Sequence, residues 1–66
     1  MSMWIARDRN GELYIFEDKP ILVKDKYEVD WNKSSKRWFE LLPDYIMPEV
    51  TFENSPQQVE LKLVEK

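Results

Sequence analysis

The stretch that decides the fold is MWIARDRNGELYIF, which spans residues 3–16. It contains Gly11, the only glycine of the chain, three residues after Asp8. Asp at the first position and Gly at the fourth are typical of a type I turn followed by a bulge, because glycine adopts positive φ without steric cost. The stretch therefore predicts a β-hairpin with strands at about 3–7 and 12–16.

Two turn types compete for this hairpin, and they give different strand registers. The bulged turn pairs Trp4 with Phe16, Ala6 with Tyr14 and Ile5 with Ile15. A tighter turn at Asn10-Gly11 would place Trp4 opposite Glu17 instead. Since aromatic and aliphatic pairs across two strands stabilise a sheet, the bulged register is predicted.

Both faces of the predicted hairpin are apolar. One face carries Trp4, Ala6, Tyr14 and Phe16, and the other carries Ile5, Leu13 and Ile15. A sheet with one solvated face would alternate apolar and polar residues more cleanly. The pattern therefore predicts burial on both sides, by a curled sheet or small barrel, or by another segment or another chain.

Alternation and turn residues predict a second hairpin further along the chain. Tyr27, Val29 and Trp31 alternate with acidic residues, which is typical of a strand. A polar turn follows at 32–36, and residues 37–42 are expected to return as the partner strand.

The remaining segments carry weaker signals. Whether residues 21–26 form a strand stays open, because their apolar run is short. Pro43 and Pro48 leave room for about one helical turn, so a 3₁₀ turn is predicted near 44–47. Further predicted elements are an extended piece at 50–52, a turn at 54–56 and a last strand at 59–63.

These elements predict an all-β fold of about five short antiparallel strands, because no segment shows a sustained helical period. The strands would form a meander or a small SH3-like barrel. Residues 40–50, ELLPDYIMPEV, resemble the fourth-strand and 3₁₀ region of SH3-like domains. That resemblance concerns architecture, and fold does not fix function.

Length and composition bound the rest of the interpretation. The chain has 66 residues, of which 42% are apolar, a net charge of −3 and neither cysteine nor histidine. One small domain over residues 1–66 is expected, with its aromatic residues supplying most of the core. No apolar run approaches the ~20 residues of a membrane helix. Residues 1–9 lack a secretory signal, so a cytoplasmic protein without membrane attachment is expected.

The sequence predicts no catalytic residue, cofactor or metal, and we expect a protein that is not an enzyme. Its serines lie in no recognisable catalytic frame, and no histidine could activate them. Residues 8–12, DRNGE, share residue types with the start of a calcium loop. A strand begins at about Glu12, however, so the hairpin turn is the favoured interpretation.

A basic cluster offers one binding hypothesis. Lys33, Lys36 and Arg37 precede Trp38 without an intervening acid. Cations beside an aromatic ring suit single-stranded nucleic acid, whose bases stack on such rings. The chain is acidic overall, and phosphate contacts depend on cations, so nucleic-acid binding is the weaker alternative.

The negative charge of the chain arises after residue 40. Residues 41–61 contain four acidic residues and no basic one. The candidate partner-binding residues are Asp44, Tyr45, Met47, Glu49 and Glu53. An acidic rim around apolar anchors suits a basic protein partner. The competing interpretation is that the apolar residues of this region are core and the acids only solvated.

Protein binding is therefore the leading hypothesis, as an interaction module or a modulator of a partner protein. Self-association is a third hypothesis, because small chains often gain stability in this way. In that case the two-sided hairpin would pack against a copy of itself or within a larger assembly.

Two stretches resemble a group of small proteins from phages and mobile elements of gut bacteria. They are MWIARD with Gly11, Leu13-Tyr14 and Lys19-Pro20, and PEVTFENSP at 48–56 followed by Val59-Glu60-Leu61. The resemblance implies a bacterial or phage setting and a cytoplasmic site, and it implies no particular activity. Members of that group begin at the Met-Trp pair, so translation from Met1 and translation from Met3 are both open.

Overall fold

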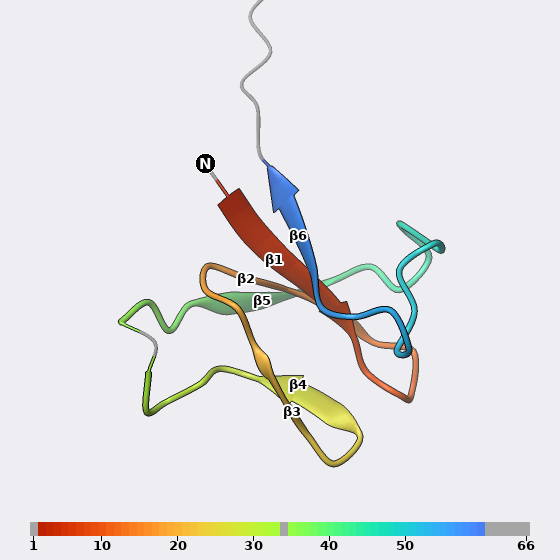
Figure 1. Ribbon diagram of the computed structural model, residues 1–66. Coiled ribbons are helices and arrows are strands. Elements are labelled where there is room, and N and C mark those ends of the chain that lie inside the picture. The colour runs from red at the N-terminus through yellow and green to blue at the C-terminus, as the bar shows by residue number, and fades with distance from the viewer. Residues whose placement is uncertain (1, 34, 61–66) are drawn as a thin grey trace, which may run out of the picture.

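The computed structural model describes residues 2–33 and 35–60 (Figure 1). Its six strands are β1 (Ser2–Arg7), β2 (Leu13–Phe16), β3 (Ile21–Val23), β4 (Lys26–Glu28), β5 (Phe39–Leu42) and β6 (Gln57–Glu60). Four of them form an antiparallel sheet in the order β5-β2-β1-β6, and β3 and β4 form a separate pair. The all-β class is confirmed, and no helix of the described residues is long and apolar enough to cross a membrane.

The first hairpin has the predicted bulged register. Trp4 lies opposite Phe16, and Ile5 lies opposite Ile15. In the turn, the Gly11 N–H donates to the Asp8 carbonyl at 3.0 Å, and the Asp8 N–H donates to the Glu12 carbonyl at 2.8 Å. Gly11 has a φ of +96°, which is the conformation that selects glycine there.

The predicted second hairpin is wrong. Strand β5 pairs with β2 and places Phe39 opposite Phe16, whereas β4 pairs with β3. Lys24 lies in the turn between β3 and β4 with a φ of +58°. A lysine is not a turn signal, so the sequence did not reveal that 21–23 and 26–28 are strands of one hairpin. The main sheet is consequently no meander, and β5 and β6 are its two edges.

The segment between β5 and β6 also differs from expectation. No 3₁₀ helix forms at 44–47. Two turns follow each other instead, closed by hydrogen bonds from Ile46 N–H to the Pro43 carbonyl (3.3 Å) and from Val50 N–H to the Met47 carbonyl (3.0 Å). Of the expected extended piece at 50–52, residues 50 and 51 lie in no turn, whereas Phe52 begins a turn that covers 52–54 and not the predicted 54–56.

The last strand is partly as predicted. Strand β6 covers residues 57–60, begins two residues earlier than expected and pairs with β1. The part of the predicted 59–63 strand beyond residue 60 lies outside the described residues.

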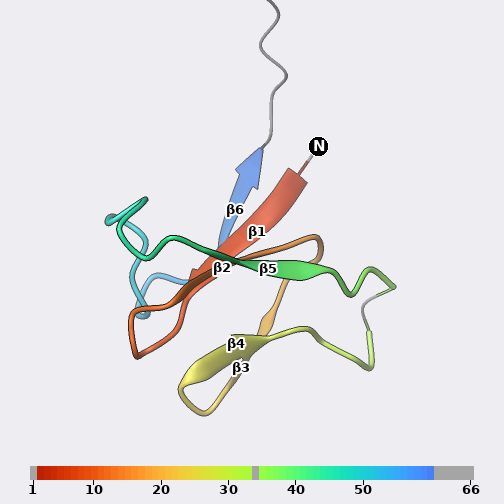
Figure 2. The same cartoon turned by 180° about the vertical axis from the view of Figure 1, so that it is seen from behind.

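The first hairpin is buried on both faces, as its sequence predicts. One core layer contains Ala6, Phe16, Tyr27 and Val29, with Trp4, Tyr14 and Phe52 packed against it. The other contains Ile5, Leu13 and Val50, with Leu42, Ile46 and Val59 packed against it. Segments of the same chain cover both faces, and the β3–β4 hairpin lies below the main sheet in both ribbon views (Figure 2).

Candidate functional site

Arg7, the last residue of β1, holds the loop that follows β5. Each of its five guanidinium N–H groups donates to a backbone carbonyl. Nε bonds Val50, Nη1 bonds Gly11 (2.7 Å) and Asp44 (3.0 Å), and Nη2 bonds Ile46 (3.0 Å) and Met47 (3.1 Å). Four of these five carbonyls belong to residues 44–50, a segment without a strand. Arg7 therefore supplies hydrogen bonds that a sheet neighbour would otherwise provide.

A second network fixes the neighbouring turn. The Asn54 side chain donates to the Glu49 carbonyl at 2.8 Å and accepts from the Thr51 N–H at 2.8 Å. The Ser55 hydroxyl donates to the Thr51 carbonyl at 2.6 Å and accepts from the Arg7 N–H at 2.9 Å. Together with the guanidinium, these bonds connect the backbone of 44–55 to the end of β1.

The fixed loop presents the predicted partner-binding residues at the surface. We call Asp44, Tyr45, Met47, Glu49 and Glu53 the acidic loop surface. Tyr45 is 79% exposed and Met47 is 39% exposed, and the three carboxylates are exposed. Two other apolar residues of the region belong to the core, as the competing interpretation predicts: Phe52 and Ile46 pack against the two core layers.

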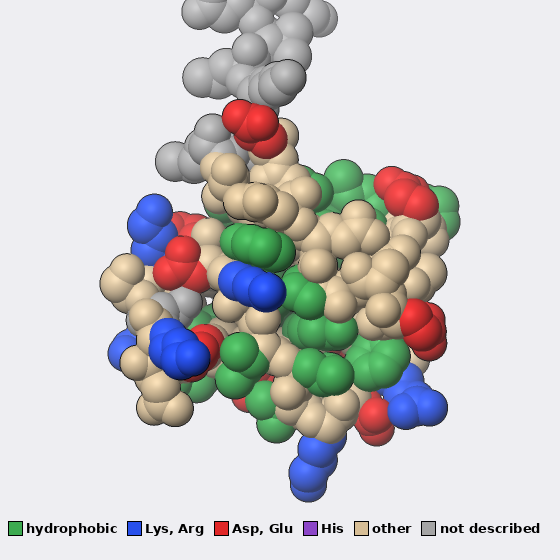
Figure 3. Space-filling view, in the orientation of Figure 1, with side chains coloured by type: hydrophobic (Ala, Val, Ile, Leu, Met, Phe, Trp, Pro, Cys, Tyr) green, Lys and Arg blue, Asp and Glu red, His purple; other side chains and the backbone are tan. Residues whose placement is uncertain are grey.

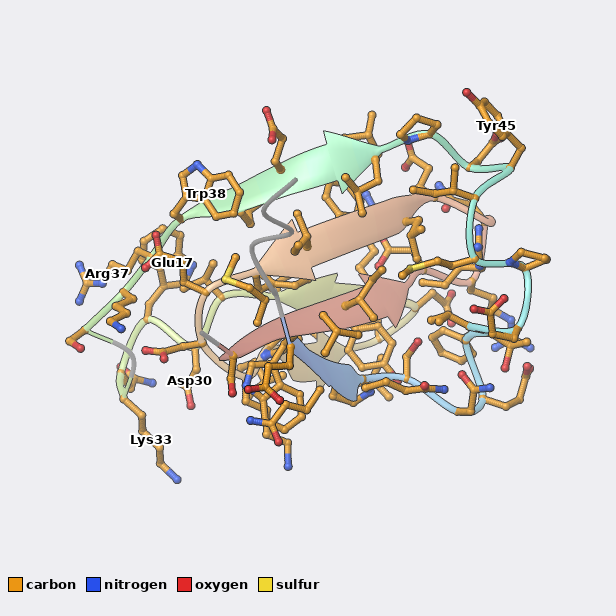
Figure 4. All side chains as sticks on the ribbon, turned by 90° about the horizontal axis from the view of Figure 1, so that it is seen from above. Glu17, Asp30, Lys33, Arg37, Trp38 and Tyr45 are labelled. Atoms are coloured by element: carbon orange, nitrogen blue, oxygen red, sulfur yellow. The ribbon has the colours of Figure 1, made fainter. Side chains whose placement is uncertain are left out.

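Three of the four predicted nucleic-acid residues lie at the opposite end of the molecule from Tyr45 (Figure 4). Lys33, Arg37 and Trp38 are found there together with Glu17 and Asp30. This end therefore carries both signs of charge and is not a basic patch.

Some residues of the predicted nucleic-acid cluster already contact other residues at this end of the molecule. The Arg37 guanidinium lies 5.3 Å from the Trp31 ring centroid and donates to the Trp31 carbonyl at 3.1 Å. The Lys36 N–H faces the Asp18 carboxylate at 3.4 Å. Trp38 is 44% exposed and is the free aromatic surface of the cluster.

A cleft of about 180 Å³, which the sequence did not predict, lies between the main sheet and the segment around β4. We call it the aromatic cleft. Its aromatic lining residues are Tyr14, Phe16, Tyr27, Trp31 and Phe39, and its charged ones are Asp8, Lys26 and Glu28. These residues come from four separate segments, so no local pattern marks them. Figure 3 shows hydrophobic side chains at the surface of the molecule.

Asp8 is the buried charge of the aromatic cleft. Its side chain is 3% exposed, and Oδ1 accepts the Tyr27 N–H at 2.8 Å. Burial raises the pKa of this carboxyl above its usual range, against the lowering effect of the Tyr27 hydrogen bond. Burial also raises the pKa of the Tyr14 and Tyr27 hydroxyls.

The turn that resembled the start of a calcium loop has other bonding partners. Asp8 faces Tyr27, and the Asn10 side chain donates to the Glu12 carboxylate at 2.9 Å. Within residues 2–33 and 35–60, no cluster of three or more acidic side chains is arranged to hold a metal ion.

No protein-family model, no curated protein and no solved structure matches the chain.

Proposed function

We propose that the protein is a small non-catalytic module that binds a basic partner protein through the acidic loop surface. The observation that carries this proposal is the exposure of Tyr45 on a backbone that Arg7 holds at four carbonyls. Tyrosine is a frequent anchor of protein interfaces. A loop that is already ordered loses little entropy on binding, which favours affinity.

The charges of the loop support a basic partner. Asp44, Glu49 and Glu53 surround Tyr45 and Met47 in the sequence, and all three are exposed. Among the described residues none of these three carboxylates forms an ion pair, since the one ion pair there joins Arg9 and Asp25. The rim is therefore free to attract cations of a partner and to steer its approach. The sequence resemblance adds a setting to the proposal, namely modulation of a bacterial or phage protein in the cytoplasm.

Photo-crosslinking from two positions tests this proposal. A crosslinking amino acid replaces Tyr45 in one variant and Trp38, at the opposite end, in the other. In a bacterial lysate, we expect a discrete crosslinked protein from position 45 and none from position 38. In pull-downs with the chain that carries no crosslinker, recovery of that protein should fall with Tyr45→Ala and with Glu49→Lys. Equal crosslinking from both positions, or recovery that neither substitution changes, refutes the acidic loop surface.

Self-assembly is a second candidate, and strand β5 favours it. β5 has one strand neighbour, and its Phe39 and Leu41 are 48% and 53% exposed. An open edge with apolar residues can pair with a copy of itself. Glu40 lies between them and opposes such pairing, because two copies centred there would bring like charges together. Sedimentation at several concentrations decides the point: a concentration-dependent dimer that Leu41→Lys abolishes supports this role, and a strict monomer ends it.

Nucleic-acid binding remains the weakest of the three proposals, since Lys33 and Arg37 lie among acidic side chains. Titration of tryptophan fluorescence with oligonucleotides at low salt tests it. Quenching that salt abolishes would support it, because phosphate contacts release counterions.

A further inference from the structure

The aromatic cleft has the architecture of a site for a positive charge. Three of its rings form one cluster, with centroid distances of 5.9 Å for Phe16 and Phe39 and 6.1 Å for Tyr14 and Phe39. Phe16 is 2% exposed, whereas Phe39 and Trp31 are 48% and 55% exposed. The cleft therefore extends from the interior to an open mouth with exposed rings. The faces of aromatic rings carry partial negative charge and attract cations.

A carboxylate lies deep in this cleft without a cationic partner. Asp8 is 3% exposed and receives the Tyr27 N–H, a neutral donor. Among the described residues, the only ion pair joins Arg9 and Asp25. Lys26 also lines the cleft, and its charge lowers the pKa of Asp8, but the two residues form no ion pair. A buried ionised carboxylate is costly unless a cation or further donors compensate it.

The ring cluster and the Asp8 carboxylate together favour one class of ligand. An anion would be repelled by Asp8, because the charges of Lys26 and Glu28, which also line the cleft, offset each other. A neutral apolar group would fill the space but would remove water from Asp8 without replacing it. A cation with an apolar stem satisfies the carboxylate and the rings together.

We propose that the aromatic cleft binds an alkylammonium group, with its charge beside Asp8 and its stem against the rings of Phe16 and Phe39. The group belongs either to a free amine or to a lysine side chain of a partner. This site is distinct from the acidic loop surface, so either proposal can fail without the other. Lys26 and Glu28 lie at the same cleft, and their charges offset each other in the attraction of the ligand.

An NMR titration of the full chain at pH 7 tests the proposal. The probes are butylammonium, the lysine derivative Nα-acetyl-lysine methylamide, 1-butanol and butyrate. We expect saturable shifts of the Tyr27 amide, which bonds Asp8, and of the Phe39 ring with both ammonium probes. Butanol and butyrate should leave these signals unchanged. Tighter binding of butylammonium indicates a free amine, because the peptide groups of the lysine derivative then obstruct binding, whereas equal or tighter binding of the lysine derivative indicates a side chain of a partner.

Three substitutions separate the charge from the shape of the cleft. Asp8→Asn keeps the acceptor for the Tyr27 N–H and should lower the affinity for butylammonium at least tenfold. Phe39→Leu keeps the carboxylate, removes a ring at the mouth and should lower the affinity at least threefold. Asp25→Asn removes an exposed carboxylate that pairs with Arg9 and serves as the matched control, with a change below twofold.

Two results overturn the inference. The first is an equal response to butanol and butylammonium, which would mark a hydrophobic cavity. The second is an absence of saturable shifts with either cation. Dispersed amide signals of each variant show that it is folded, and Phe39→Leu keeps the test decisive if Asp8→Asn unfolds.

Discussion

Replacing Arg7 by lysine tests whether one side chain holds the acidic loop surface in place. Lysine keeps the positive charge, but its donors radiate from one atom and cannot span five carbonyls as the planar guanidinium does. Three of the five bonds, to Gly11, Ile46 and Val50, are partly buried, and those to Asp44 and Met47 are exposed. Water replaces the exposed bonds at little cost, so the buried ones determine the effect.

The expected loss of stability follows from these bonds. A hydrogen bond to a charged group contributes about 1.5–3 kcal/mol. If lysine retains two of the three partly buried bonds and loses one, the free energy of unfolding falls by about 1.5–3 kcal/mol. The whole domain has roughly 3–10 kcal/mol on the usual scale per residue, so we expect Arg7→Lys to remain folded but to be clearly weakened. Arg7→Met, which also removes the charge, should lower the free energy of unfolding further.

Urea unfolding and amide NMR measure the two consequences separately. In Arg7→Lys the urea concentration at the midpoint of unfolding should fall, while the dependence of the unfolding free energy on urea stays the same. The amide signals of residues 44–50 should shift or broaden more than those of β2. Arg9→Lys is the matched control, because Arg9 forms a single ion pair with Asp25 in which both side chains are more than 60% exposed. Its effect should stay below about 0.5 kcal/mol. A loss below that value for Arg7→Lys, with unchanged loop signals, refutes the role of Arg7.

Three further outcomes follow from backbone conformation and from Asp8. Gly11→Ala should lower the stability by about 1–2 kcal/mol in thermal unfolding: space for a Cβ is free, but φ is +96°. Lys24→Gly, at a φ of +58°, should stabilise by less than about 1 kcal/mol, since glycine relieves the strain and loses more entropy on folding. Burial raises the folded-state pKa of Asp8, so its stabilising contribution is complete below the unfolded pKa and is lost as pH rises through the folded pKa. The wild type should therefore gain stability relative to Asp8→Asn between pH 7 and pH 3.5 in urea midpoints, and an opposite trend contradicts this sign.

The hairpin register was predictable because all its determinants lie within 14 residues. Gly11 fixed the turn, and the pair Trp4–Phe16 distinguished between the two registers. The partner of β5 was not predictable, since the apolar residues of 39–42 fit either neighbour. The β3–β4 turn depends on Lys24, whose left-handed backbone has no sequence signal.

The candidate sites, like the strands, were predictable only where they depend on local sequence. Charge counting located the exposed acidic loop surface, because it needs only the local composition. It did not reveal the role of Arg7, whose partners on this loop are carbonyls 37–43 residues away. Backbone carbonyls exist at every residue, so no side-chain pattern points to them. The aromatic cleft was missed because it combines a turn residue, Asp8, with rings from distant segments.

The pairing of β1 determines when the main sheet can be completed during synthesis. Its partners are β2, which follows within the same hairpin, and β6, where Ser2 pairs with Glu60. The first strand therefore stays without its second neighbour until residues 57–60 have left the ribosome. At about 5–20 residues per second this takes on the order of 3–10 s. During that interval one edge of β1 is uncovered, and the nascent chain presents it to any factor that binds extended segments.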